Sequence, residues 1–152
     1  MVERWLELAH ELLEEHPSSS GVRRRAVSTA YYAVFHTIAR ICADEIAAGH
    51  DRSSTEYTMV YRSLEHAGVR NALTSGPLAE SARLRRIGEA FKLLQEERLK
   101  ADYMPPIRGV IELSEARELL AEAEFVVEEL EALSAATRQT LVIRLLIKDR
   151  KR

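Results

Sequence analysis

Residues 28–40, with the sequence STAYYAVFHTIAR, decide the fold that the sequence predicts. Their apolar positions recur at helical spacing and belong to one long helix that we predict over 20–48. The core stripe of this helix consists of Val27, Tyr31, Val34, Phe35, Ile38, Ile41 and Cys42. A second, polar row recurs at every fourth residue: Ser28, Tyr32, His36 and Arg40. A step of four residues turns a helix by only about 40°, so this polar ladder runs beside the core and needs polar partners elsewhere.

The composition limits the class of protein. A chain of 152 residues with 46% apolar and 30% charged residues is typical of one globular domain with a substantial core. The net charge of −2 excludes a uniformly basic nucleic-acid binder and leaves room for a local basic patch. No apolar run is long enough to span a membrane, and no signal-peptide pattern begins the sequence, so we expect a cytoplasmic protein with no membrane partner.

The remaining periodicity is helical as well. We predict helices over 2–15, 54–67 and 78–101, a loop over 68–77, and a last helix that starts after Ser114 and can run to the tail. The fold class is therefore all-α, an up-and-down four-helix bundle with an additional short helix. We assign 1–136 to the bundle and 137–152 to a C-terminal helical extension or basic tail of the same domain. The apolar segment TLVIRLLI (140–147) can be a strand, a buried helix end or a helix that docks on another subunit, and we favour the docking helix.

The predicted helix over 78–101 carries a possible partner for the polar ladder. Its apolar residues alternate steps of three and four up to Leu94, and the next step lands on Arg98. Asp102 follows four residues later, at the spacing of a helical ion pair, and Tyr103 comes next. A guanidinium between a carboxylate and a phenol can be a structural knot or an anion site. The alternative is that Arg98 simply extends to solvent at the helix end.

Two segments carry a family resemblance. Ser28–His36 (STAYYAVFH) and Arg98–Tyr103 (RLKADY) resemble the S-x-A-Y-Y-A-x-F-H and R-x-x-A-D-Y segments of small stand-alone prokaryotic members of the HEPN superfamily. The resemblance covers roughly 5–133. It implies an all-α bundle that forms a homodimer and binds RNA or a nucleotide. It also implies a metal-independent ribonuclease toxin with a minimal nucleotidyltransferase as antitoxin, and no cofactor or metal.

The sequence departs from the family's catalytic pattern, which is an arginine followed after four to six residues by a histidine. Tyr103 stands where that histidine is expected, and a phenol with an ordinary pKa near 10 is a poor base at neutral pH. His36 is the candidate that could supply an imidazole instead. The pair Arg62 and His66 has only three residues between its members and does not fit the pattern. Whether the protein is an enzyme is therefore left open.

We take Arg98, Tyr103 and His36 as candidate catalytic residues. The candidate nucleotide- or RNA-binding residues are Arg98, Asp102, Tyr103, Tyr32 and Arg25, the last from the basic cluster 23–25. The scattered histidines show no metal-ligand spacing. The rival hypothesis is a non-catalytic interaction module in which the Arg98 cluster is structural, and a third is a small-ligand pocket between the helices over 20–48 and 78–101.

Overall fold

The computed structural model describes residues 1–148, and all the regular structure in this range is helical, which confirms the all-α prediction. The helices are α1 (Val2–Glu15), α2 (Ser20–Ile46), α3 (Thr55–Arg62), α4 (His66–Ser75), the short 3-10 helix η1 (Pro77–Glu80), α5 (Ala82–Tyr103), α6 (Leu113–Glu131) and α7 (Ala135–Leu146).

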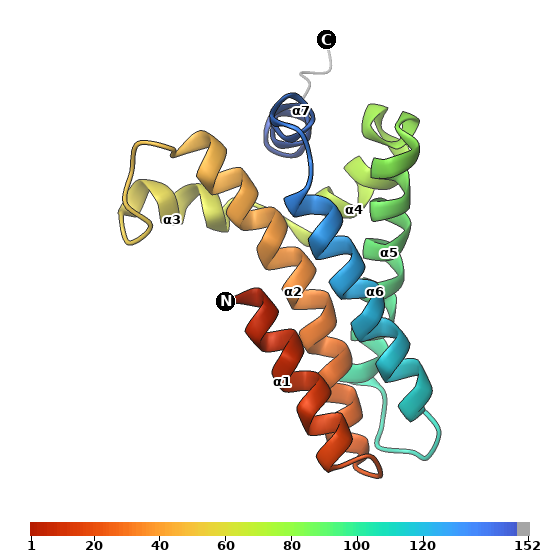
Figure 1. Ribbon diagram of the computed structural model, residues 1–152. Helices are drawn as coiled ribbons and strands as arrows, with labels where there is room; N and C mark the ends of the chain where they lie inside the picture. The colour runs from red at the N-terminus through yellow and green to blue at the C-terminus, as the bar shows by residue number, and fades with distance from the viewer. Residues whose placement is uncertain (149–152) are drawn as a thin grey trace.

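Four long helices form the bundle. The helices α1, α2, α5 and α6 run side by side with alternating direction, and α2 packs against each of the other three (Figure 1). The length of α1 is 14 residues, or about 21 Å, whereas α2 has 27 residues, or about 40 Å. Consequently α1 covers only one half of α2. The other half projects beyond it toward α3 (Figure 1).

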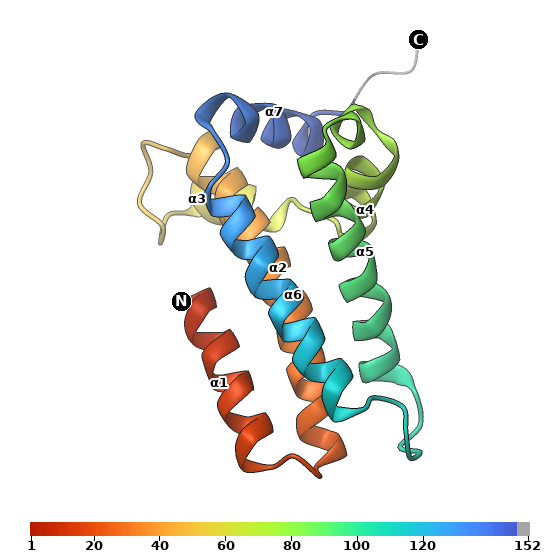
Figure 2. The same ribbon diagram turned by 45° about the vertical axis from the view of Figure 1, so that its right-hand side comes forward.

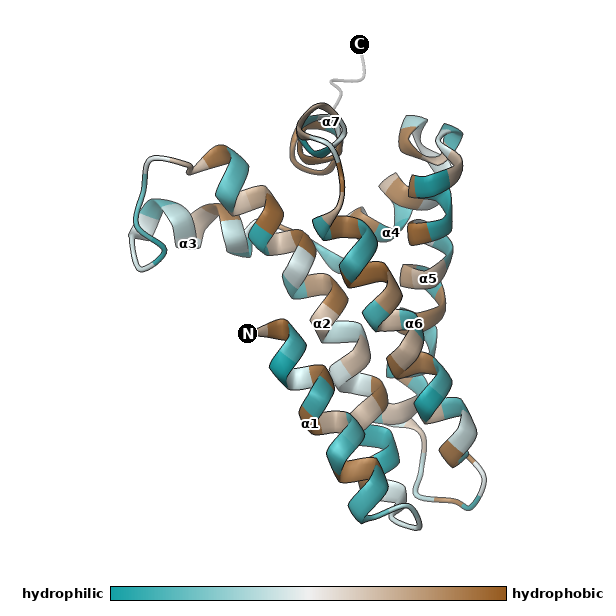
Figure 3. Cartoon of the chain, viewed as in Figure 1, coloured by the Kyte–Doolittle hydropathy of each residue, from teal (hydrophilic) through white to brown (hydrophobic). Residues whose placement is uncertain are grey.

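The core lies where α2 meets its neighbours. Fully buried side chains line the meeting faces, including Tyr31, Ile38 and Ile41 of α2 and Phe91 and Leu94 of α5. Apolar and polar segments alternate along α1 and α6, as expected of amphipathic helices with one face on a core (Figure 3).

Serine side chains define the start of four helices. Ser19, Ser54, Ser81 and Ser134 accept hydrogen bonds from the backbone N–H three residues later, at the N-termini of α2, α3, α5 and α7. Each bond satisfies one amide that the first helical turn cannot pair. The cap at Ser134 separates α6 from α7, which the apolar periodicity alone would have joined.

The prediction of one helix over 54–67 followed by a loop over 68–77 is wrong. The helix α3 ends at Arg62, and the Ser63 hydroxyl donates a 2.6 Å hydrogen bond to the Val60 carbonyl there. A new helix, α4, then starts at His66 and contains Gly68, which we had taken as a helix stop. A glycine in the first helical turn does not end a helix when tertiary packing holds the turn.

The C-terminal part also differs from the prediction. The last predicted helix is two helices, because Ser134 caps a new one after α6 ends at Glu131. The helix α7 crosses the end of the bundle, against α2 and α4, with Leu141 and Val142 buried (Figure 2). The segment 140–147 is thus helical through Leu146, and Leu141 and Val142 pack on the chain's own helices. Docking of this helix on another subunit stays a prediction. Residues 149–152 of the predicted basic tail lie outside the described residues.

Two smaller boundaries were also misplaced. The helix predicted over 20–48 ends at Ile46. The one predicted over 78–101 begins with η1 and continues, as α5, to Tyr103. The structure adds α3, α4 and α7 to the four long helices, where the sequence suggested one extra helix.

Candidate functional site

Arg98 occupies the core-facing position that the spacing of α5 predicts. The residue is only 9% exposed, and its Nη1 lies 3.5 Å from Asp102 Oδ2, one turn further along the same helix. Its buried Nε has no hydrogen-bond partner among the described residues. A buried guanidinium with an unmet donor is costly unless other interactions offset it.

Two tyrosine rings of α2, the helix that carries the polar ladder, offset this cost. The Arg98 Cζ lies 5.0 Å from the ring centroid of Tyr31 and 5.5 Å from that of Tyr32, within the range of cation–π attraction. On the same side, the Ser28 hydroxyl donates a hydrogen bond to Asp102. The first half of the ladder therefore meets Arg98 and Asp102, and this contact joins α2 to α5.

The imidazole beside Arg98 belongs to His66. From the sequence, His66 is considered only in a pair with Arg62, and the spacing of that pair does not fit the catalytic pattern. His66 is the first residue of α4 and stacks on Phe35, with ring centroids 4.0 Å apart. Its Nδ1 shares a hydrogen bond with the Tyr31 hydroxyl. The sequence signal closest to this placement is Ser63, because it marks the break after α3 from which α4 starts and packs on α5. The number of residues between Arg62 and His66, by which that pair is rejected, does not show that His66 lies near Arg98.

The titration of this cluster follows from its burial. Burial raises the pKa of Tyr31 to about 12, against the opposing effect of Arg98, so its hydroxyl stays protonated at neutral pH. Burial lowers the pKa of His66, and the neighbouring Arg98 and His36 lower it further. At neutral pH the Arg98 cluster, defined as Ser28, Tyr31, Tyr32, His66, Arg98 and Asp102, thus holds a neutral phenol, a neutral imidazole and a paired guanidinium.

Two candidate catalytic residues lie outside this cluster. Tyr103 is the last residue of α5 and is 74% exposed. His36 is one turn beyond Tyr32, with the two ring centroids 6.2 Å apart, and its Nδ1 lies 2.6 Å from the Tyr61 hydroxyl of α3. The predicted meeting of Arg98, Tyr103 and His36 at one point does not occur.

The outward side of the ladder forms the floor of a hollow between α1 and α2. This α1–α2 groove has a volume of about 400 Å³. Ser28, Tyr32 and His36 of α2 line it, facing Trp5 and Leu12 of α1. Burial lowers the pKa of His36, so its imidazole is neutral at neutral pH and able to accept a proton. Arg98 is absent from this lining.

Arg25 supplies the guanidinium of the groove. Its two neighbours in the basic cluster are occupied: Arg23 donates to the carbonyls of Pro17 and Ile111, and Arg24 donates to those of Ala101, Met104 and Pro105. Arg25 is exposed, lines the groove and has no hydrogen bond or ion pair to another described residue. The groove therefore carries one cation available to an anionic ligand.

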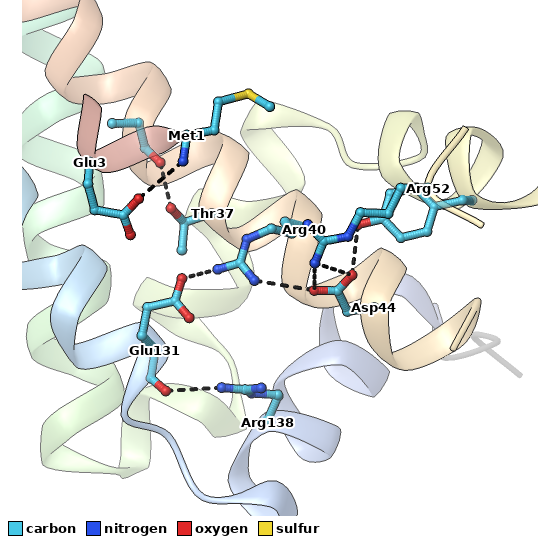
Figure 4. A network of polar contacts seen from close by, with 10 residues as sticks. Met1, Glu3, Thr37, Arg40, Asp44, Arg52, Glu131 and Arg138 are labelled. Carbon is cyan, nitrogen blue, oxygen red and sulfur yellow. Dashed lines mark hydrogen bonds and ion pairs between the residues drawn. The ribbon is translucent and has the colours of Figure 1, made fainter. Parts of the chain in front are cut away.

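A second hollow lies beyond the end of α1, where α2 meets α3. This corner pocket has a volume of about 720 Å³ and shares Trp5 and His36 with the α1–α2 groove. Arg40 sits at its edge between Glu131 and Asp44, and Arg52 reaches the same Asp44 (Figure 4). The last residue of the ladder is therefore paired, but with carboxylates far from the Arg98 cluster.

Residues 1–148 show two further features that bear on the site. They contain no group of three or more histidine, cysteine, aspartate or glutamate side chains placed to hold a metal ion. None of their helices has both the length and the apolar character that crossing a membrane requires.

Comparison with known proteins adds no further similarity. No family model, curated protein or solved structure matches the chain.

Proposed function

We propose that this protein is a HEPN-like helical bundle that binds RNA or a nucleotide in the α1–α2 groove. The observation that carries the proposal is Arg25, an unpaired guanidinium at a groove whose floor is the polar ladder. Tyr32 offers a hydroxyl there, and His36 offers an imidazole. A cation beside aromatic and hydrogen-bonding side chains suits a phosphate ester with bases attached.

The groove also limits the chemistry that this function can include. Among residues 1–148, His36 is the imidazole that lines it, and its lowered pKa keeps it in the neutral form that can accept a proton from a ribose hydroxyl. Tyr103, exposed at the end of α5, is not among the residues that line the groove. Cleavage of RNA, together with the homodimer and the nucleotidyltransferase antitoxin that the family resemblance implies, stays a prediction.

A second candidate role concerns the Arg98 cluster alone. Arg98 is nine-tenths buried, paired with Asp102 and covered by two tyrosine rings. These contacts favour the alternative in which the cluster is structural and joins α5 to α2. Under this assignment Arg98 supports the groove floor from behind, through Tyr32, and does not itself contact a phosphate.

Titration of the protein with single-stranded RNA tests the main proposal. The probe carries 2′-O-methyl groups, which block cleavage, and a fluorophore whose anisotropy reports binding. We expect Arg25→Ala to weaken binding about 5- to 10-fold at low salt, or about 1–1.4 kcal/mol, which is within the range for the net contribution of one hydrogen bond. The slope of log Kd against log salt concentration should also fall by about 0.7, the single-strand value for one contact.

Arg117→Ala is the matched control, because Arg117 is an exposed arginine on α6 that lines neither hollow. It should leave both the affinity and the salt slope unchanged. Equal effects of the two substitutions, or none from Arg25→Ala, would contradict binding in the groove.

A further inference from the structure

The corner pocket is walled by four aromatic side chains from three helices. Trp5 comes from α1, His36 from α2, and Tyr57 and Tyr61 from α3. Their rings contact one another in sequence: the centroid distances are 5.3 Å from Trp5 to His36, 5.7 Å from His36 to Tyr61 and 6.3 Å from Tyr61 to Tyr57. The ring planes of the last two pairs differ by only 27° and 28°, so His36, Tyr61 and Tyr57 lie roughly parallel along one side of the pocket.

Hydrogen bonds orient this wall. The Tyr61 hydroxyl pairs with His36 Nδ1 at 2.6 Å, and the Tyr57 hydroxyl donates to Asp44 at 2.8 Å. The hydroxyls of Tyr57 and Tyr61 are thus paired within the protein. Tyr57 is only 6% exposed, so the half-buried rings of Tyr61 and His36 are the ones on which a ligand in the pocket can stack. A ligand that stacks on rings already held in place loses less free energy to ordering them.

The charged groups of the pocket differ in how firmly they are held. Arg40 is 28% exposed and lies between Asp44 and Glu131 (Figure 4). Arg52 is 69% exposed and reaches Asp44 only at 3.3 Å, a weak surface contact. Arg52 can therefore turn to a ligand phosphate at little cost, whereas Arg40 holds the carboxylates in place.

The corner pocket and the α1–α2 groove meet at Trp5 and His36, which line both. Along α2, Arg25 and His36 are eleven residues apart, or about 16 Å. A ligand that reaches from Arg25 into the corner pocket must therefore be an extended chain with aromatic groups.

We propose that the corner pocket stacks a nucleobase, and that groove and pocket together bind one single-stranded RNA segment of several nucleotides. This inference rests on the proposed function, since it extends RNA binding from the groove into the pocket. Single-strand binding proteins combine a cationic track for the backbone with aromatic faces for the bases. Here Arg25 and Arg52 are the cations, and Tyr61 with His36 is the stacking face.

Trp5 provides a direct probe of this site, because it is the only tryptophan of the chain and lies where the two hollows meet. We expect a 2′-O-methyl decanucleotide to change its fluorescence on binding. AMP and inorganic phosphate, which cannot span both hollows, should bind at least tenfold more weakly.

Two substitutions of Tyr61 separate stacking from hydrogen bonding. Tyr61→Leu removes the ring and should weaken decanucleotide binding about 5- to 150-fold, the range for losing one stacked base. Tyr61→Phe keeps the ring and removes only the hydroxyl that faces His36, so its affinity should stay within about threefold of the original. Circular dichroism of both variants confirms that the helices are retained.

The possible outcomes distinguish the two proposals. Binding by Tyr61→Leu at the original affinity, with Arg25→Ala still weakened, would overturn stacking in the corner pocket and keep the groove as the RNA site. AMP binding as tight as the decanucleotide would overturn the extended site. If the original protein does not bind the decanucleotide, both the proposed function and this inference are wrong.

Discussion

At the scale of single residues, Arg25 and Arg98 differ in burial. Arg25 is exposed and can reach a ligand, whereas Arg98 is nine-tenths buried. The helical spacing of α5 correctly predicts that Arg98 faces the core and pairs with Asp102. The sequence could not show that His66 completes the cluster, because that contact depends on how the chain turns after α3. Nor could it show that Arg25 differs from its two neighbours, whose carbonyl partners come from distant loops.

A substitution of Arg98 tests its structural role. We expect Arg98→Ala to lower the free energy of unfolding by about 2–4 kcal/mol, because it opens a cavity and removes two cation–π contacts. Arg98→Met keeps most of the buried volume of the side chain and should lose less than half as much. Urea unfolding measures both, and a fully stable Arg98→Ala variant would show that the cluster does not support the fold.

At the scale of helices, the sequence predicts the long elements and misses the breaks between short ones. Apolar residues at helical spacing predict α1, α2 and α5, because each of these helices buries one apolar face against the core. The breaks before α4 and α7 depend on individual serines, Ser63 and Ser134, whose hydrogen bonds compete with continued helix. Sequence patterns extend over several residues and therefore do not resolve such single-residue events.

The close packing of α4 on α5 rests on Gly88. A Cβ added there would lie 2.6 Å from the Leu73 carbonyl oxygen, which belongs to the backbone and cannot move aside cheaply. Gly88→Ala should therefore destabilise the protein by about 1–3 kcal/mol, although alanine favours helices over glycine.

Gly68→Ala is the control within the same helix pair, because its nearest contact would be 3.8 Å from Glu65 Cβ. It should stabilise the protein by about 0.5–1 kcal/mol. Thermal unfolding of both variants measures the difference, and a neutral Gly88→Ala would show that α4 and α5 can separate without loss.

At the scale of the whole molecule, the bundle leaves a half-covered central helix whose exposed side carries the site. Because α1 is about half as long as α2 (Figure 1), the ladder lines the groove under α1 and then the corner pocket beside α3. The sequence predicts the four long helices and the ladder that produce this arrangement. It does not predict the two hollows, because they depend on where α3 lies relative to α1.

The stability of the whole molecule should depend on pH through the half-buried histidines His36 and His66. The pKa values of His36 and His66 are lowered in the folded protein, so near pH 6.5 the unfolded chain binds more protons. Stability is therefore complete well above pH 6.5 and falls as the pH drops below it, by at most about 1.4 kcal/mol per pH unit for each histidine.

Urea unfolding between pH 7.5 and pH 5 measures this dependence. His66→Gln should flatten part of it, because a glutamine does not titrate. A His66→Gln variant with an undiminished slope would show that His66 is not the group responsible.

The central claim is that the α1–α2 groove binds RNA while the Arg98 cluster holds it in shape. The most direct test compares the RNA affinities of two variants, Arg98→Met and Arg25→Ala. Both are titrated with the 2′-O-methyl decanucleotide under the same conditions. The account predicts that Arg98→Met binds within about twofold of the original protein, whereas Arg25→Ala is weakened about 5- to 10-fold. A folded Arg98→Met variant that loses binding as much as Arg25→Ala, or more, would contradict the account.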